Sequence, residues 1–106
     1  MGDAYVNFIY SLALSKRLGE PLGKKVSSDV LAKSLKKANL RDLLPSRIDR
    51  HKQADAAEAL ILYVWARKII SLDEAVRILE SEEMPEEGFS LLLKKIWEKV
   101  KSKSII

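Results

Sequence analysis

The chain has 106 residues, of which 47% are hydrophobic and 32% charged, and its formal net charge is +4. This length suits one domain, residues 1–106. The absence of cysteine excludes disulfides and thiolate metal sites, no apolar run is long enough to span a membrane, and no Gly-rich loop indicates a nucleotide cofactor. We therefore expect a cytoplasmic protein, and abundant Lys and Glu with little Gln and Asn is typical of a thermophilic source.

Helical spacing without any strand pattern predicts an all-α fold of about six helices. The first is expected over about residues 3–17 and is closed by Gly19. The second begins at Ser27 or Ser28, either of which can act as the N-cap, and has an apolar inner face and a basic outer face. A short turn of helix follows over residues 40–44, before a basic, irregular stretch.

The fourth helix, from near Arg50 to near Ile70, is the expected centre of the core. Residues 59–66 contain no charge, Gly or Pro, which predicts that this part is buried on every side. Ser71 then opens a capping box with Glu74, in which each side chain bonds to the other residue's backbone N–H. The last helix is expected to begin at Pro85, with acidic residues in its first turn.

Two of these apolar helices begin with oxygen-bearing side chains. Asp55 and Glu58 are three residues apart, so they are neighbours on one face of the central helix, and the same stripe continues through Leu62 and Trp65. We therefore expect both carboxylates to point towards the core. Because an unpaired buried carboxylate costs several kcal/mol, the sequence should also supply a partner, and a divalent cation is one that serves both.

The first helix has a similar pair, Asp3 and Asn7, four residues apart. Gly-Asp-Ala at residues 2–4, followed about fifty residues later by Ala-Asp-Ala-Ala-Glu-Ala at residues 54–59, resembles the ribonuclease III catalytic domain. That family carries Leu-Gly-Asp-Ala/Ser in its signature and Ala-Asp-x-x-Glu-Ala-Leu-Ile in a later helix. Lys-Val-Ser-Ser at residues 25–28 also resembles Tyr-Val-Ser-Ala of the compact bacterial form, which lacks a double-stranded RNA-binding domain. The resemblance covers residues 2–66.

The resemblance implies an all-α ribonuclease III-like domain that hydrolyses phosphodiester bonds of structured or double-stranded RNA as a homodimer. Asp3, Asp55 and Glu58 match the family's catalytic metal ligands, and their hard oxygens suit Mg²⁺ or Mn²⁺. The structural alternative is that Asp3 is a helix N-cap and that Asp55 and Glu58 pair with Arg50, Lys52 or the tyrosines. Asn7 is either an outer metal ligand or a buried hydrogen-bonding residue. The family's usual glutamate four residues before the motif aspartate is missing here, as it is in the compact form.

Charge is segregated along the chain. Residues 16–52 hold eleven Lys or Arg against four Asp or Glu, a net of +7, whereas residues 71–87 hold one against seven, a net of −6. A basic stretch between the two acidic motifs is expected to hold a polyanion beside the metal site, although its lysines would equally solvate amphipathic helices. The expected RNA contacts are Lys24, Lys25, Lys33, Lys36, Lys37, Arg47, Arg50 and Lys52.

Two alternatives to an RNA-cleaving enzyme stay open. One is a ribonuclease III fold that binds RNA or a ribosomal particle without cutting it. The other is a helical interaction domain whose acidic residues 71–87 meet a basic partner. His51 is expected at the surface or on a phosphate more than as a general base. A homodimer interface is expected around Leu12, Ile61, Tyr63 and the last helix.

Overall fold

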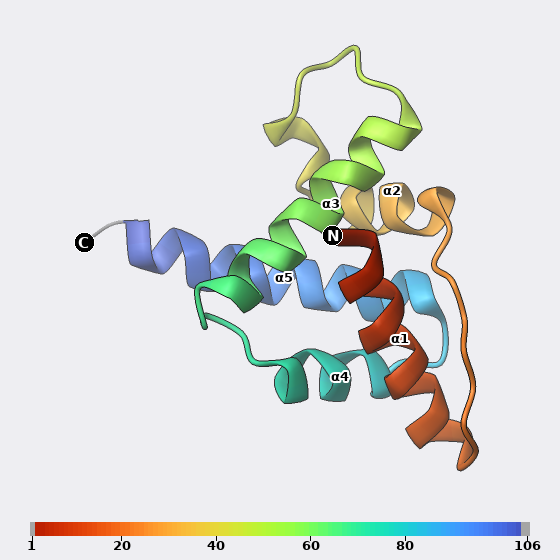
Figure 1. The fold of residues 1–106 in the computed structure, drawn as a ribbon. Coiled ribbons are helices and arrows are strands. Elements are labelled where there is room, and N and C mark those ends of the chain that lie inside the picture. Colours follow the sequence, from red (N-terminus) through yellow and green to blue (C-terminus); the bar gives the residue numbers. More distant parts are fainter. Residues whose placement is uncertain (1, 105–106) are drawn as a thin grey trace.

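The computed structural model describes the backbone of residues 2–104 and the side chains of residues 2–102. The regular secondary structure of this part of the chain is helical, and it contains no strand. The all-α prediction is therefore confirmed, and the shortest of the six expected helices is a single 3₁₀ turn. In chain order the elements are α1 (Gly2–Leu18), α2 (Ser28–Lys37), η1 (Arg41–Leu43), α3 (Arg50–Ala66), α4 (Leu72–Glu80) and α5 (Pro85–Ser104), as Figure 1 shows.

Side-chain caps set where three helices begin. Ser27 accepts from the backbone N–H of Val30 at 3.1 Å, and Ser71 accepts from that of Glu74 at 3.1 Å, as the sequence predicts. Asp49 caps α3 in the same way, accepting from the N–H of Lys52 at 2.9 Å. The second bond of the expected capping box, from the Ser71 N–H to the Glu74 side chain, gives way to an ion pair. The Glu74 carboxylate lies 3.3 Å from the ammonium of Lys99 on α5.

The five helices pack around one core. α1 contacts α3 and α4, α2 contacts α3 and α5, and α4 also packs on α5. The largest fully buried side chains are aliphatic, together with Phe89 of α5. The buried hydroxyl of Ser34 lies 2.7 Å from the carbonyl oxygen of Val30 and 3.2 Å from that of Glu86, so its polar group is satisfied where α2 meets α5.

α3 corrects two predictions. It ends at Ala66, four residues before the expected end at Ile70, and Lys68 then adopts a positive φ of 59°. Nor is it buried on every side. Its buried stripe is Ala54, Ala57, Ile61 and Val64, whereas Ala59 is exposed, Tyr63 is 43% exposed and Trp65 is 41% exposed. The reason is that a chain of this size has too few helices to surround one of them completely.

A strap, defined here as residues 22–26, links α1 to α2 and runs alongside α1 (Figure 1). Three side chains of α1, one turn apart, hold its backbone. Asn7 Oδ1 accepts from the N–H of Val26 at 2.8 Å. The hydroxyl of Ser11 bonds to both the N–H and the carbonyl of Lys24, at 2.8 and 2.9 Å. The hydroxyl of Ser15 does the same for Leu22, at 2.8 and 3.2 Å. The strap is thus fixed along the helix without being part of a sheet.

Candidate active site

The start of α1 lies directly on α3. A Cβ atom on Gly2 would come within 3.2 Å of the Glu58 Cβ and within 3.5 Å of the Glu58 carbonyl carbon and oxygen. A side chain at this position would be in tight contact with Glu58, so glycine allows the close approach of the two helices. One turn further along, the rings of Tyr5 and Trp65 stack with centroids 5.0 Å apart. These two contacts place Asp3 beside the face of α3 that carries Glu58.

Three carboxylates share this end of the molecule. The pKa of Glu58 is raised above its ordinary value, first by burial and then by the negative charges of Asp3 and Asp55. Glu58 therefore senses one carboxylate from α1 and one from its own helix. Asp3, about fifty positions before Asp55 and Glu58 in the chain, is therefore close enough for its charge to act on Glu58.

The carboxylates are not buried, contrary to the expectation that they face the core. Asp3 and Asp55 are exposed and Glu58 is half-buried. Successive residues of a helix are rotated by about 100°, so when Ala54 and Ala57 face the core, Asp55 and Glu58 lie at its edge. This position avoids most of the cost of burying charge. It also leaves the carboxylates accessible from solvent.

The donor set fits a hard divalent cation in its chemistry. Carboxylate oxygens are the ligands that Mg²⁺ and Mn²⁺ prefer, and a cation would relieve the repulsion that raises the Glu58 pKa. Among the described residues, however, no group of three or more His, Cys, Asp or Glu side chains is already arranged around one point. The carboxylates are therefore neighbours without forming a finished cage.

Asn7 has a clear role in the fold. Its side-chain oxygen is occupied by the N–H of Val26, so this oxygen anchors the strap one turn along α1 from Asp3. That bond matches the hydrogen-bonding alternative for this residue. His51 is exposed in the first turn of α3, in line with a surface position.

The eight basic residues expected to contact RNA are all exposed, but they differ in their partners. Lys24 and Lys25 belong to the strap, Arg47 to the loop before α3, and the rest to α2 and the first turn of α3. The Lys37 ammonium pairs with the carboxylates of Glu86 and Glu87 in the first turn of α5, and these pairs raise its pKa, the Glu87 hydrogen bond most. Lys36 has no ion-pair partner within the described residues. The acidic region thus neutralises part of the basic one inside the same molecule.

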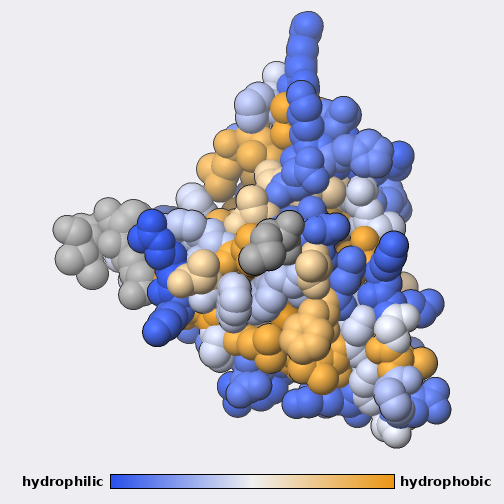
Figure 2. Space-filling view, viewed as in Figure 1, coloured by the Kyte–Doolittle hydropathy of each residue, from blue (hydrophilic) through white to orange (hydrophobic). Residues whose placement is uncertain are grey.

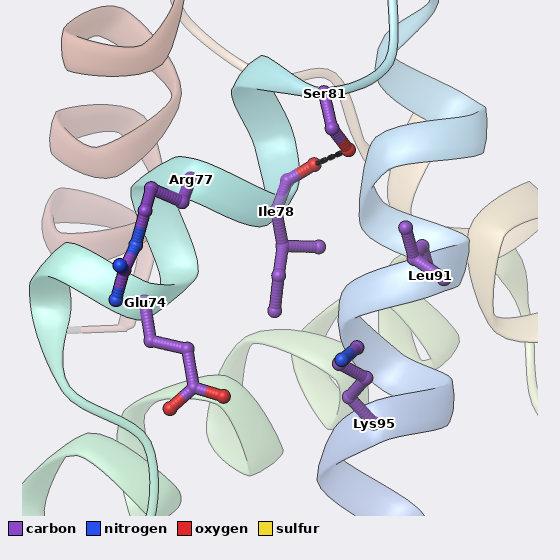
Figure 3. Close-up of a pocket in the computed structure, with 6 residues that line it drawn as sticks. All are labelled: Glu74, Arg77, Ile78, Ser81, Leu91 and Lys95. Atoms are coloured by element: carbon purple, nitrogen blue, oxygen red, sulfur yellow. Dashed lines mark hydrogen bonds between the residues drawn. The ribbon is translucent and has the colours of Figure 1, made fainter.

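Two pockets differ in what they offer. A pocket of about 220 Å³ between α2 and α3 is lined by Asp29, Ala32, Lys33, Lys36, Arg50 and Gln53. A larger one of about 460 Å³ lies between α4 and α5 and is drawn in Figure 3. In it the Ser81 hydroxyl donates to the Ile78 carbonyl, and Glu74 is the one carboxylate among six lining residues. The larger pocket contains none of the expected site residues.

Apolar side chains are exposed close to the carboxylates. Phe8 is 55% exposed and lies on the turn of α1 after Tyr5, which stacks on Trp65. We call Tyr5, Phe8 and Trp65 the α1/α3 apolar face. Figure 2 shows apolar side chains gathered beside α1 in the view of Figure 1.

Two of the expected dimer contacts lie away from the α1/α3 apolar face. Ile61 is 1% exposed and belongs to the core, and Tyr63, rotated by about 200° from Trp65 around α3, carries the Arg67 guanidinium 5.1 Å from its ring centroid.

The model of the family described as Ribonuclease III matches residues 1–100, nearly the whole chain. The chain belongs to the ribonuclease III family. A search of curated proteins finds no match. Within the described residues of this ribonuclease III family member, no helix is long and apolar enough to cross a membrane.

Proposed function

We propose that this ribonuclease III family member is a metal-dependent endoribonuclease that hydrolyses phosphodiester bonds of structured or double-stranded RNA. The observation that carries the proposal is that α1 meets α3 where Gly2 lies against Glu58, which places Asp3 close enough for its charge, with that of Asp55, to act on Glu58. A carboxylate whose pKa is raised by neighbouring carboxylates at an accessible surface is a candidate for metal binding or catalysis. Family membership makes RNA the expected substrate class.

Asp3, Asp55 and Glu58 would hold Mg²⁺ or Mn²⁺ through their oxygens. The bound ion would supply a water of lowered pKa and offset the charge that builds on the phosphate. The chain itself contributes position. Gly2 lets α1 approach α3, the Tyr5–Trp65 stack holds the two helices together, and the exposed edge of α3 gives a backbone phosphate access to the carboxylates.

RNA would be held by its backbone. A-form helices are recognised by shape and through phosphates and 2′-hydroxyls, which suits lysines and arginines spread over α2, the strap and the start of α3. Lys24, Lys25, Lys36, Arg47 and Lys52 have no ion-pair partner within the described residues, so they are the readiest contacts. Contacts of this kind bring affinity without sequence preference.

The test is cleavage of a duplex RNA with Mg²⁺ or Mn²⁺ under single-turnover conditions. The wild type should cut, and Glu58→Gln should lose cleavage by several orders of magnitude while still binding RNA, because the substitution removes a charge needed only for chemistry. Asp73→Asn on α4 removes an exposed carboxylate away from the site and is the control that should cut normally. If the wild type binds the duplex but neither metal yields a cut that Glu58→Gln abolishes, the enzyme proposal fails.

One observation favours a second candidate function, RNA or ribosome binding without cleavage. The carboxylates within the described residues are not arranged as a ready metal site. In that case the basic surface would serve binding alone, and Glu58→Gln would change nothing in the cleavage assay. The same experiment therefore separates the two functions.

We further expect a homodimer that uses the α1/α3 apolar face. Apolar groups exposed together beside a candidate site mark interaction surfaces, and family members pair through two copies of the same domain. Sedimentation at micromolar concentration should show a dimer, and Phe8→Asp should give a monomer. Met84→Asp, which places the same charge on another exposed apolar side chain, 59% exposed against 55% for Phe8, should leave the dimer intact. A monomeric wild type would contradict the expectation.

A further inference from the structure

The pocket between α2 and α3 is a cationic pocket that already contains an anion. Lys33 and Lys36 approach it from α2, and Arg50 and Gln53 from the first turns of α3. Its volume of about 220 Å³ equals that of several water molecules at about 30 Å³ each, which is room enough for a phosphate group. Asp29, in the first turn of α2, projects its carboxylate among these cations.

Asp29 makes both of its ion pairs within this pocket. Its Oδ2 lies 3.1 Å from the Lys33 ammonium, and its Oδ1 lies 3.1 Å from a guanidinium nitrogen of Arg50. Each oxygen thus binds one cation, one from each helix, as two oxygens of a phosphate would. The hydrogen bond from Lys33, with the charges of Lys33 and Arg50, lowers the pKa of Asp29, because these cations favour its charged form.

Neither cation has a better partner. Lys33 also lies 3.9 Å from Glu86, at the limit of an ion pair, and its side chain is 55% exposed. The Arg50 side chain is 61% exposed and pairs with Asp29. Such exposed pairs are weak and are easily exchanged for another anion. An anionic ligand would therefore have to displace only the Asp29 carboxylate to pair with Lys33 and Arg50.

We infer that this pocket is a subsite for an RNA backbone phosphate and that Asp29 occupies the place of that phosphate in the free protein. The inference rests on the proposed RNA-binding function, and it adds that the Asp29 carboxylate competes with RNA for Lys33 and Arg50. RNA must displace Asp29 to reach Lys33 and Arg50, so the chain weakens its own affinity at this point. Arg50 precedes Glu58 by eight residues, about 12 Å along α3, so the pocket and the carboxylates flank one stretch of the same helix.

The test is duplex RNA binding without divalent metal, measured from low to high salt for Asp29→Asn. Removing the competitor should free up to two cations for phosphates, raise affinity about threefold to tenfold near physiological salt, and steepen the slope of log K against log[salt] by about one to two. Asp42→Asn is the matched control. It removes an exposed carboxylate of the same basic region, with the same change in net charge, and should raise affinity less than about twofold and leave the slope unchanged.

A second arm removes the cations. In the Asp29→Asn background, replacing Lys33 and Arg50 by Gln should abolish the gain in affinity. Asp29→Ser, which keeps a residue suited to a helix start, repeats the test if Asn perturbs α2.

The outcomes separate the two levels of the proposal. If the wild type binds duplex RNA but Asp29→Asn and Asp29→Ser gain no more than Asp42→Asn, the inference about the pocket is overturned and RNA binding stands. If neither the wild type nor any variant binds duplex RNA, the proposed function and the inference fail together.

Discussion

Two groups of carboxylates on this molecule have opposite electrostatics. Near the start of α1, Glu58 is raised in pKa by burial and by the charges of Asp3 and Asp55. Between α2 and α3, Asp29 is lowered in pKa by Lys33 and Arg50. Both groups lie along α3, one after the other. In the first group, neighbouring carboxylates repel one another, and a cation would relieve this repulsion. In the second group, the carboxylate of Asp29 already pairs with the two cations.

The difference indicates that the two groups bind ligands of opposite charge. A metal ion would stabilise the first group, and an RNA phosphate would exchange with the anion of the second. The two groups can therefore be perturbed independently, because each responds to a ligand of the opposite charge. Three experiments sharpen or break this distinction.

The largest effect is expected from divalent metal on stability. A ligand that binds only the folded state stabilises it by about 2.7 kcal/mol at one hundred times its Kd, so the melting temperature should rise with Mg²⁺ or Mn²⁺. The double variant Asp55→Asn, Glu58→Gln should lose this rise, whereas Asp29→Asn should keep it. Differential scanning calorimetry measures all three. An equal response of all three proteins would mean that the carboxylates near α1 do not bind the metal.

A smaller effect is expected on RNA affinity, and it compares two neighbouring lysines. Lys36 has no ion-pair partner within the described residues, whereas Lys37 is held by Glu86 and Glu87. Lys36→Ala should weaken duplex RNA binding about threefold to tenfold near physiological salt and flatten the salt slope by about one, because one phosphate contact is lost. Lys37→Ala should do less. Equal losses of affinity in the two variants would show that Lys37 contacts RNA as well as Lys36 does, despite its pairs with Glu86 and Glu87.

The smallest effect is on the stability of the metal-free protein. Because the pKa of Glu58 is raised, the fold loses stability as pH rises from the unfolded pKa to the folded pKa and stays weaker above. Glu58→Gln should therefore increase the free energy of unfolding at pH 7, by less than about 1 kcal/mol because Glu58 is only half-buried and solvent still screens part of its charge. Urea unfolding in EDTA measures it.

Asp29→Asn should act in the opposite direction in the same experiment. The contribution of Asp29 is present above its unfolded pKa and is lost as pH falls through its lower folded pKa, so the variant should be less stable at pH 7. The Glu58 difference should disappear below the unfolded pKa of Glu58, where this carboxyl is protonated in folded and unfolded chains. The Asp29 difference should shrink only as the pH falls through the lowered folded pKa of Asp29. Changes of the same sign in both variants at pH 7 would contradict the contrast between the two groups.

Local signals in the sequence predicted the helix starts well. Ser27, Ser71 and Pro85 act on their own first turn, so their effect does not depend on what packs against the helix. The Ala-Asp-x-x-Glu-Ala pattern likewise identified the residues that the structure brings near Asp3. The Asp49 cap was missed, since a charged residue in a basic, irregular stretch gives little sign of which helix it serves.

Burial and ion pairing were not predictable in the same way. Residues 59–66 are apolar around the whole helix, so periodicity alone cannot tell which side meets the core and which remains exposed. The Lys37 pairs join residues about fifty positions apart, and they form only once α2 and α5 pack together. The role of Asn7 was open for a similar reason, because its partner Val26 lies in a segment without regular structure.

The strap has a consequence for how the chain tolerates changes in length. Four residues of helix advance about 6.0 Å and two residues of extended chain about 6.6 Å, so bonds from Asn7, Ser11 and Ser15 can recur at alternate strap residues. Backbone N–H and carbonyl groups alternate in direction along an extended chain. Inserting one residue between Leu22 and Val26 would turn the backbone groups that bond to Asn7, Ser11 and Ser15 away from α1. Inserting two residues would restore their direction and shift the chain by the spacing between two successive bonds. Length variation in this connection is therefore expected to come in even steps.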